Sequence, residues 1–442
     1  MDAFVIDGGR RLEGRLRVNG SKNAALPIMA GVLLTDQPIT LRDVPDLSDI
    51  RNMVRLLGEL GVAIGRETDT QGRPIFCVQT IDERASHARY DIVRTMRASI
   101  CVLGPMLARR GKARVSLPGG CAIGQRPVDL HLKGLEALGA VITLEDGDIV
   151  ADVPGGRLTG ATIFLGGNNG STVLGTANVM SAATLASGTT IIECAACEPE
   201  IVDLANMLNA MGAKIEGAGS PRLTIRGVES LRGVDHTVIP DRIEAGTLMC
   251  AAGITDGDLT LDNCPLDAMM AATNTLEAIG VSVEPIGSGD DPMRRTCRVR
   301  RSGPLASVPI TTQPHPGFPT DLQAQFMALL CVAEGDSVIT EKIFPERFLH
   351  VAELQRMGAS LNRQGATCVA KGVQSLNGAQ VMASDLRASA GLVLAGLAAQ
   401  GNTTINRVYH IDRGYEGLED RIASVGGRIR RKKVSSEPVA IS

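Results

Sequence analysis

One segment recurs six times along the 442-residue chain, and this repeat constrains the fold more than any other feature. In every copy a helix-like stretch ends in a small apolar signature, as in "LEALGAVI" and "LEAIGVSV". The same place in each copy holds a glycine, which is typical of the residue that ends a helix before a β-branched strand. The six glycines, spaced 68 to 78 residues apart, are Gly61, Gly139, Gly212, Gly280, Gly358 and Gly426.

A second helix, rich in Ala, Leu, Met and Gly, precedes each signature. In five copies it ends at a glycine that leads into an alternating strand, as in "RRGKARVSL" and "ASGTTIIEC". Helices made of small apolar residues indicate burial on nearly all sides. One copy therefore corresponds to strand, helix, strand, helix, strand, with a further short strand expected. Because this period exceeds the roughly 20–50 residues of common solenoid repeats, a superhelical array is disfavoured.

The length favours two domains over one core. Six copies split three and three predict an α/β (α+β) protein of two similar domains, each with buried helices surrounded by sheets. We expect a cleft between the domains. Aromatic residues make up only 2% of the chain, so the core is expected to be aliphatic.

Composition and charge exclude several function classes. A formal net charge of −3 argues against a general nucleic-acid binder, and the basic run Arg428 to Val434 is interpreted as a solvated tail. Ten cysteines spread along the chain suit a reducing compartment. No basic start followed by an apolar run is visible, and the longest apolar run, Ala25 to Leu34, is too short to cross a membrane. We therefore expect a soluble cytoplasmic protein without membrane or nucleic-acid partners; the oligomeric state stays open.

The residues that open the six small-residue helices carry the most informative chemistry. Four of the six openings contain a cation, although a helix N-terminus favours acidic residues. Such a local conflict is expected at functional sites, and converging helix ends with cations would form an electropositive pocket for phosphate or carboxylate. The alternative is that each cation has a nearby carboxylate partner or points into solvent. The four cations are Lys22, Arg97, Arg242 and Arg387.

Two further residues stand out by their setting. Asp321 opens a helix in "HPGFPTDLQAQF", where it is either a capping acid or, near a hydroxyl-bearing substrate, a proton acceptor. Cys121 lies in the glycine-rich loop "SLPGGCAIGQRPVDLH" and is either an ordinary free thiol or a reactive thiol beside an anion site. No paired histidine spacing is present, so no metal site is indicated and no cofactor is expected.

Several motifs together closely resemble the enolpyruvyl transferases, and among them the UDP-N-acetylglucosamine 1-carboxyvinyltransferases. The similarity follows the chain order over nearly the whole length. The motifs are "NGSKNAALP", "MRASICVLGP", "SLPGGCAIGQRPVDLHLKGLEALGA", "EPEIVDLANMLNAMGAKI", "PDRIEAGT", "HPGFPTDLQAQF", "ASDLRASAGLVLAG" and "YHIDRGYEGLEDRI".

The resemblance implies two domains of three inside-out repeats each, with the active site in the cleft between them. The first domain would be discontinuous, comprising residues 1–20 and 236–442, and the second, residues 21–235, would carry the Cys121 loop. The implied reaction transfers the enolpyruvyl group of phosphoenolpyruvate to the 3-hydroxyl of UDP-N-acetylglucosamine and releases phosphate. It proceeds by addition and elimination through a tetrahedral ketal, and it is the first committed step of peptidoglycan synthesis, hence of cell wall biogenesis, shape and division.

The resemblance also implies residue roles. Cys121 corresponds to the proton donor, which can add to phosphoenolpyruvate and is the residue that fosfomycin alkylates, and Asp321 to the base or hydroxyl-orienting carboxylate. The implied catalytic residues are Cys121, Asp321, Lys22 and Arg413. The implied phosphoenolpyruvate-binding residues are Lys22, Asn23, Arg126, Arg387 and Arg413. The implied residues for UDP-N-acetylglucosamine are Arg97, Arg126, Pro127, Val128, Asp129, Leu130, Thr172, Val173, Asp321 and Ile343. Other motifs that line the family's cleft contain Asp49, Glu198, Asp241 and Arg347.

One segment departs from the family pattern. In "GGNNGSTVLGTANVM", Gly170 stands where a lysine often occurs, so backbone amides are expected to replace a side chain in contacts with the diphosphate. Two alternatives to the UDP-sugar enzyme stay open. One is an enolpyruvylshikimate-phosphate synthase with the same architecture, and the other is a non-catalytic paralogue that binds UDP-sugars.

Overall fold

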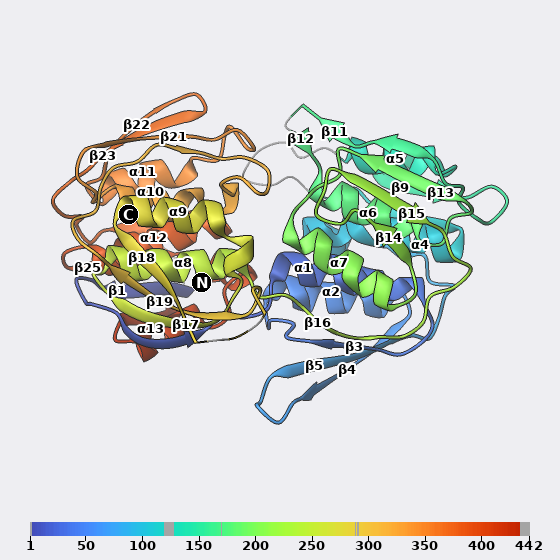
Figure 1. Ribbon diagram of the computed structural model, residues 1–442, viewed down its shortest axis with the longest axis horizontal. Coiled ribbons are helices and arrows are strands. Elements are labelled where there is room, and N and C mark those ends of the chain that lie inside the picture. Colours follow the sequence, from blue (N-terminus) through green and yellow to red (C-terminus); the bar gives the residue numbers. More distant parts are fainter. Residues whose placement is uncertain (1, 119–127, 169, 288, 290, 434–442) are drawn as a thin grey trace, which may run out of the picture. The chain divides into compact units, whose positions relative to one another are not determined.

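A computed structural model describes residues 2–118, 128–168, 170–287, 289 and 291–433 of the chain (Figure 1). They form two compact units. Unit 1 contains residues 2–18 and 240–433, and unit 2 contains residues 19–118 and 128–239. The predicted Cys121 loop, with Arg126 and Pro127, lies outside the described residues.

Each unit contains three four-stranded sheets with one shared topology. An edge strand pairs in parallel with the second strand, and the third and fourth strands follow in antiparallel order. In unit 2 the sheets are β16 (Asp235–Thr237), β3 (Ile39–Arg42), β5 (Pro74–Thr80), β4 (Val62–Thr68); β6 (His87–Ala88), β7 (Lys112–Ser116), β9 (Asp148–Asp152), β8 (Val141–Glu145); and β10 (Thr162–Phe164), β13 (Thr189–Glu193), β15 (Arg222–Arg226), β14 (Lys214–Glu216).

Unit 1 repeats this arrangement. Its sheets are β2 (Glu13–Arg17), β17 (Asp258–Cys264), β19 (Arg295–Arg301), β18 (Val281–Ile286); β20 (Ile310–Thr311), β21 (Asp336–Thr340), β23 (Thr367–Lys371), β22 (Ser360–Gln364); and β24 (Gln380–Met382), β25 (Asn402–Asn406), β1 (Asp2–Asp7), β26 (Arg428–Lys433). The prediction of two similar units, each built from three repeats, is therefore confirmed.

The small-residue helices lie inside the sheets and are buried on almost every face, as their composition predicts. In α12, for example, residues 387–397 are all buried. Within the described residues, no helix combines the length and apolarity needed to cross a membrane. These inner helices are α1 (Lys22–Gly31), α4 (Leu103–Arg110), α6 (Val173–Ala183), α8 (Arg242–Ile254), α10 (Gln323–Leu330) and α12 (Leu386–Ala398).

Six outer helices end at the repeated glycines. All six glycines have positive φ angles, between +80° and +106°, so the prediction that they end helices is confirmed. Side chains other than hydrogen are strained in this conformation, which explains why the position is a glycine in every copy. The outer helices are α2 (Ser48–Glu59), α5 (Asp129–Ala137), α7 (Pro199–Ala210), α9 (Met270–Ile279), α11 (Leu349–Arg356) and α13 (Leu418–Ser424).

The boundary near residue 236 differs from the expected one. A cut between residues 235 and 236 would divide β16, which pairs with β3 of unit 2. His236 and Ile239 also belong to this unit, because both contact the buried carboxylate of Asp203 at 3.0 Å. The chain therefore leaves unit 2 after Ile239.

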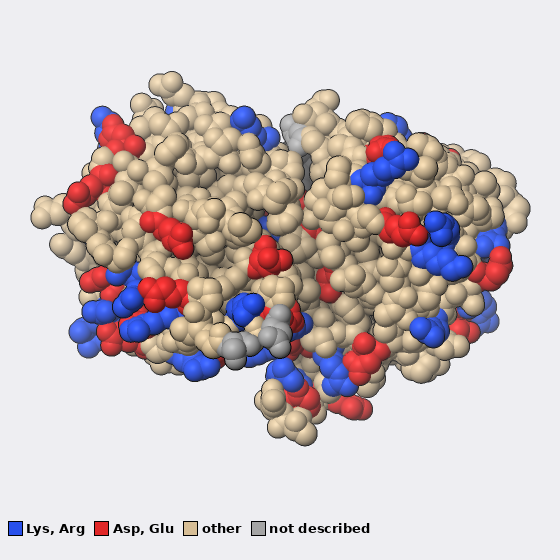
Figure 2. Space-filling view, viewed as in Figure 1, with Lys and Arg blue, Asp and Glu red and all other residues tan. Residues whose placement is uncertain are grey.

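The interpretation of the basic run as a solvated tail is wrong for residues 428–433. These residues form β26, which pairs with β1 at the other end of the chain. Arg431 also contacts Asp412 at 2.6 Å and Glu419 at 2.5 Å. Figure 2 shows Lys and Arg beside Asp and Glu over the area where β1, β17 and β19 lie in Figure 1. Within the basic run, Arg428 and Arg431 thus each form an ion pair with a carboxylate.

The close crossing of α4 and α6 yields a stability prediction. A Cβ atom on Gly104 would overlap the backbone carbonyl oxygen of Asn178, whose side chain also accepts a hydrogen bond from the Gly104 amide at 2.6 Å. We expect Gly104→Ala to lower the free energy of unfolding by about 3 kcal/mol, because two packed backbones must separate.

Gly58 is the matched control. It lies on the exposed side of α2, and a Cβ atom there would meet nothing within 4 Å. Gly58→Ala should raise the free energy of unfolding by about 0.5–1 kcal/mol because alanine restricts the unfolded chain. Chemical denaturation of both variants measures the difference, and equal effects would contradict the close packing of α4 on α6.

Candidate active site

Asp321 lies between two guanidinium groups of unit 1. It belongs to the short helix η4 (Thr320–Leu322), which leads directly into α10. Its Oδ1 accepts a hydrogen bond from Arg347 Nη1 at 2.7 Å, and its Oδ2 accepts from Arg387 Nη2 at 3.0 Å and Nε at 3.2 Å. The Asp321 side chain is 26% exposed, whereas both arginines are almost fully buried. The carboxylate is thus fixed by two arginines and still partly exposed.

These contacts decide between the two interpretations of Asp321. The N-cap residue of η4 is Pro319, and no side chain caps this helix. The carboxylate instead forms ion pairs with residues distant in sequence. The interpretation of Asp321 as a simple capping acid is therefore not supported. Its fixed, partly exposed oxygens suit the acceptance of a hydrogen bond or proton from a substrate hydroxyl.

Arg387 is a buried cation in the first turn of α12. The Asp385 side chain caps this helix by accepting hydrogen bonds from the Arg387 and Ala388 amides at 2.9 Å and 3.1 Å. Burial alone would lower the pKa of Arg387, but Asp321, Tyr415 and Asp241 together raise it above the usual value. Arg387 therefore keeps its charge inside the protein and can fix a neighbouring anion.

A second carboxylate, that of Glu341, links the chain segments next to Asp321 by hydrogen bonds. Its Oε1 accepts hydrogen bonds from Thr312 Oγ1 at 2.7 Å and from the Ile343 and Phe344 amides at 2.9 Å and 3.0 Å. Its Oε2 accepts from Thr320 Oγ1 at 2.9 Å. This fully buried side chain therefore ties the predicted substrate contact Ile343 to η4. The sequence pattern did not point to Glu341, whose neighbours in "ITEKIF" give no local signal beyond a strand end.

Unit 2 carries a comparable buried ion pair. Lys22 is the first residue of α1, and its Nζ lies 3.1 Å from Oδ2 of Asp49, which belongs to α2. Both side chains are at most 10% exposed. Asn23, next to Lys22, and Arg97, the first residue of η2 (Arg97–Val102), are partly buried in the same unit.

The structure favours the carboxylate alternative for some of the cations at the helix openings. Lys22 and Arg387, two of the four cations at helix openings, each contact a carboxylate. An isolated buried charge is costly, so a cation near the core requires such a partner. These two helix openings therefore carry both a cation and a carboxylate. The alternative that a cation has a nearby carboxylate partner is correct for Lys22 and Arg387.

The other predicted residues of unit 2 lie at the openings of two helices. Val128 and Leu130 are partly buried and flank Asp129, the exposed first residue of α5. Thr172 caps α6, because its Oγ1 accepts a hydrogen bond from the Gly175 amide at 3.2 Å, and Val173 begins the helix. In unit 1, Arg413 is the last residue of η5 (Val408–Arg413) and is partly buried.

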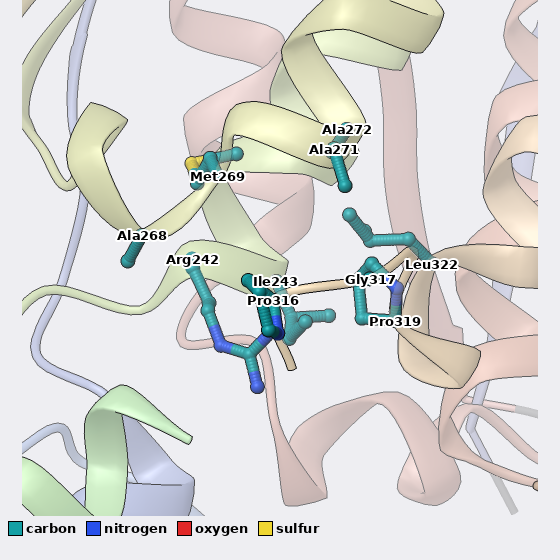
Figure 3. A pocket seen from close by; sticks show the side chains of 10 residues that line it. All are labelled: Arg242, Ile243, Ala268, Met269, Ala271, Ala272, Pro316, Gly317, Pro319 and Leu322. Carbon is teal, nitrogen blue, oxygen red and sulfur yellow. The ribbon is translucent and has the colours of Figure 1, made fainter. Parts of the chain in front are cut away.

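A small pocket of unit 1 lies beside η4 (Figure 3). Pro319 and Leu322, which flank Asp321, form part of its wall. Arg242, the first residue of α8, contributes the cation, while Met269, Ala271 and Ala272 are apolar. No group of three or more His, Cys, Asp or Glu side chains that could hold a metal ion occurs among the described residues. The lining of this pocket is mostly apolar, with Arg242 as the one charged residue among the described residues that form it.

The chain is similar to known proteins over nearly its whole length. The model of the family described as EPSP synthase (3-phosphoshikimate 1-carboxyvinyltransferase) matches residues 6–422. The chain belongs to the EPSP synthase family. One relative, the UDP-N-acetylglucosamine 1-carboxyvinyltransferase of Anaeromyxobacter sp. (strain Fw109-5), is 53% identical, with 98% of this chain and 100% of the relative covered. The protein of the same name from Methylacidiphilum infernorum (isolate V4) is 52% identical, with 98% and 99% covered.

Solved structures of enolpyruvyl transferases share the fold of this EPSP synthase family member. The enolpyruvyl transferase NikO from Streptomyces tendae superimposes with a TM-score of 0.85 at 26% identity, covering 98% of this chain and 99% of NikO. EPSP synthase from Acinetobacter baumannii gives a TM-score of 0.74 at 19% identity, covering 98% and 100%. The latter similarity concerns the fold alone.

His350 lies three residues after Arg347 and leads to a prediction about how folding stability depends on pH. Burial lowers its pKa to about 4; Asp385 opposes this effect, and Arg347 and Arg363 add to it. The unfolded chain, with a histidine pKa of about 6.5, therefore binds a proton that the folded protein excludes. Stability is highest above this range and falls as the pH drops from about 6.5 towards 4.

We expect the His350 contribution to cost about 2 kcal/mol of folding free energy when the pH falls from 7.5 to 5. His350→Gln removes this titration, so the variant should lose about 2 kcal/mol less than the native protein over the same interval. Urea denaturation at both pH values provides the measurement. Parallel losses in the two proteins would show that His350 is not excluded from protonation in the folded state.

Proposed function

We propose that the protein transfers the enolpyruvyl group of phosphoenolpyruvate to the 3-hydroxyl of UDP-N-acetylglucosamine and releases phosphate. The names of the relatives at about half identity support this acceptor. The observation that carries the proposal is the Asp321 carboxylate, fixed by Arg347 and Arg387 and still 26% exposed. In the cell this reaction would take place in the cytoplasm and begin the committed synthesis of peptidoglycan.

The reaction has two stages. In the addition stage, the sugar oxygen bonds to C2 of phosphoenolpyruvate, its proton leaves, and C3 receives a proton to give a tetrahedral ketal. In the elimination stage, the C2–O bond to phosphate breaks and C3 loses a proton, which yields the enolpyruvyl ether. A carboxylate held in place, a proton donor and several cations are therefore sufficient, and no redox step occurs.

Asp321 accepts the proton or hydrogen bond of the sugar hydroxyl in this proposal. The two arginines stabilise its negative charge and leave it few orientations, which lowers the entropic cost of reaching the reactive geometry. The tether through Glu341 gives Ile343 a fixed place from which to contact the sugar nucleotide. Thr172, Val173 and the opening of α5 serve the nucleotide from unit 2, together with Arg97.

The positive charges that balance phosphoenolpyruvate come from Lys22, Arg126, Arg387 and Arg413. Asn23 offers its amide as a neutral hydrogen-bond partner. Cations stabilise the phosphate as it leaves, and this effect is strongest where water is excluded. Asp49 keeps the Lys22 ammonium group in position before the substrate arrives. Cys121 donates the proton to C3, a role that is proposed from the family motif alone because this residue lies outside the described residues.

A phosphate-release assay tests the acceptor. With phosphoenolpyruvate, we expect release of phosphate when UDP-N-acetylglucosamine is added and none above background with shikimate 3-phosphate. Asp321→Asn should reduce kcat by about 100-fold or more, because the amide cannot take up the hydroxyl proton. Circular dichroism establishes that the variant is folded.

Each alternative has its own outcome in this assay. Release with shikimate 3-phosphate alone would identify an enolpyruvylshikimate-phosphate synthase. Binding of UDP-N-acetylglucosamine without any phosphate release would identify a binding protein. Full activity of Asp321→Asn would remove this carboxylate from the mechanism.

Fosfomycin tests the role of Cys121. We expect time-dependent loss of turnover as the thiolate opens the epoxide, with one adduct on the peptide that contains Cys121. Cys121→Asp should keep measurable turnover and resist the compound, since a carboxylic acid can still donate a proton. Cys197→Ser is the control: burial raises the pKa of this thiol, so it is a poor nucleophile and its loss should leave the inactivation unchanged. Unchanged turnover of the native protein after treatment would exclude Cys121 as the reactive thiol.

A further inference from the structure

The phenol of Tyr415 lies at the meeting point of three inner helices of unit 1. Tyr415 follows η5 and comes two residues after Arg413. Its side chain is 1% exposed and is the largest fully buried side chain among the described residues. The surrounding core is aliphatic, so a hydroxyl group here requires hydrogen-bond partners. Each of the three inner helices provides one.

These partners are polar side chains of α8, α10 and α12. The Tyr415 hydroxyl lies 2.8 Å from Thr247 Oγ1, 3.2 Å from Gln325 Nε2 and 3.3 Å from Arg387 Nη1. All three partners are at most 3% exposed. The guanidinium carbon of Arg387 also lies 5.7 Å from the centre of the Tyr415 ring. The phenol therefore contacts Arg387 through both its oxygen and its ring.

The directions of these hydrogen bonds follow from the available protons. Thr247 donates its only hydroxyl proton to the Ile243 carbonyl oxygen at 2.8 Å, so it accepts from Tyr415. The nitrogens of Gln325 and Arg387 can only donate, so the Tyr415 oxygen accepts from both. Burial raises the pKa of Tyr415, an effect that Arg387 partly opposes, and the phenol keeps its proton at neutral pH. The Gln325 amide nitrogen shares its two protons among three acceptors, because it also lies 3.1 Å from Thr247 Oγ1 and 3.0 Å from the Asp321 carbonyl oxygen.

The same contacts reach Asp321 by two routes. Arg387 directs Nε and Nη2 to the Asp321 carboxylate and Nη1 to Tyr415, so the phenol contacts the guanidinium group on a nitrogen that Asp321 does not use. Gln325 binds Tyr415 and also donates to the backbone carbonyl oxygen of Asp321 at 3.0 Å. One hydroxyl group therefore influences both the side chain and the backbone of this residue.

We propose that Tyr415 is a positioning residue, whose hydroxyl holds Arg387, and through it the Asp321 carboxylate, in the geometry needed for enolpyruvyl transfer. The inference rests on the proposed function, because it gives Asp321 its role at the sugar hydroxyl. Without the hydroxyl, the aromatic ring still fills the core, but Arg387 loses one of its fixed partners. The carboxylate then has more orientations, and fewer of them suit the reaction.

The experiment compares the native protein with Tyr415→Phe. We expect kcat for phosphate release to fall at least about 10-fold, while KM for both substrates changes by less than about 3-fold. In an Arg387→Lys background, the same substitution should change kcat by less than about 2-fold, because the group it positions is already altered. A purely structural role would lower the melting temperature without this non-additivity.

Thr403→Val is the matched control for loss of a buried hydroxyl. Thr403 lies on β25, is fully buried, and its Oγ1 has no hydrogen-bond partner among the described residues. This variant should keep kcat within about 2-fold of the native value. Comparison of the two variants separates the position of the hydroxyl from the general effect of removing one.

Crystal structures of the native and Tyr415→Phe proteins separate this inference from the proposed function. Displacement or several conformers of Arg387 and Asp321 in the variant support the inference, even where the native protein releases no phosphate with either acceptor and the proposed function fails. An unchanged Arg387–Asp321 geometry, or an active native protein whose Tyr415→Phe variant keeps kcat within 2-fold, overturns the inference.

Discussion

The inner helices have no polar face, and this constraint governs the whole structure. A helix such as α12, in which residues 387–397 are all buried, cannot lie on a surface and must be enclosed. The protein solves this problem in each repeat by placing one four-stranded sheet and one outer helix beside the inner helix. The charged residues of the candidate site stand where inner helices begin, as Lys22 does in α1 and Arg387 in α12.

The charged residues at these openings are stable only as groups. Arg387 is buried and would be costly without Asp321, and Lys22 similarly requires Asp49. Neutral groups form the remaining hydrogen bonds. Threonine hydroxyls and backbone amides donate to Glu341, while Tyr415 accepts hydrogen bonds from Arg387 and Gln325. Such satisfied networks hold side chains in one arrangement, which is what a site for small anionic substrates needs before binding.

The sequence allowed the repeat architecture to be predicted because its determinants are local. A glycine with positive φ, such as Gly280 at +103°, is required by backbone geometry at one position and can be recognised without knowledge of the rest of the chain. The basic run at residues 428–433 was misjudged because only Ile429 in it is fully buried, while its pairing partner β1 lies at the opposite end of the chain. Pairing between chain ends leaves no trace in the local pattern.

The candidate site shows the same division between local and tertiary information. Lys22 and Arg387 were found because they are cations at equivalent places in a repeat, where acidic residues are favoured, and Asp321 was found because it opens the equivalent helix of another copy. Their partners were not recognised as partners, because Asp49 lies 27 residues from Lys22 and Arg387 lies 66 residues from Asp321. A buried tyrosine or glutamate has no sequence signature that separates a positioning role from ordinary packing.

The six helix openings also differ in a way that bears on function. Four inner helices are capped by their own side chains, whereas the middle repeat of each unit has no such cap and begins with a 3-10 turn. The first of these turns begins with Arg97, and the second carries Asp321 as its second residue. A side-chain cap would have used a polar group to satisfy the helix end, as Thr172 does in α6. The capped helices carry site residues as well, because there the cap and the charged residue are different residues. Ser21 caps α1 and Asp385 caps α12, while Lys22 pairs with Asp49 and Arg387 pairs with Asp321.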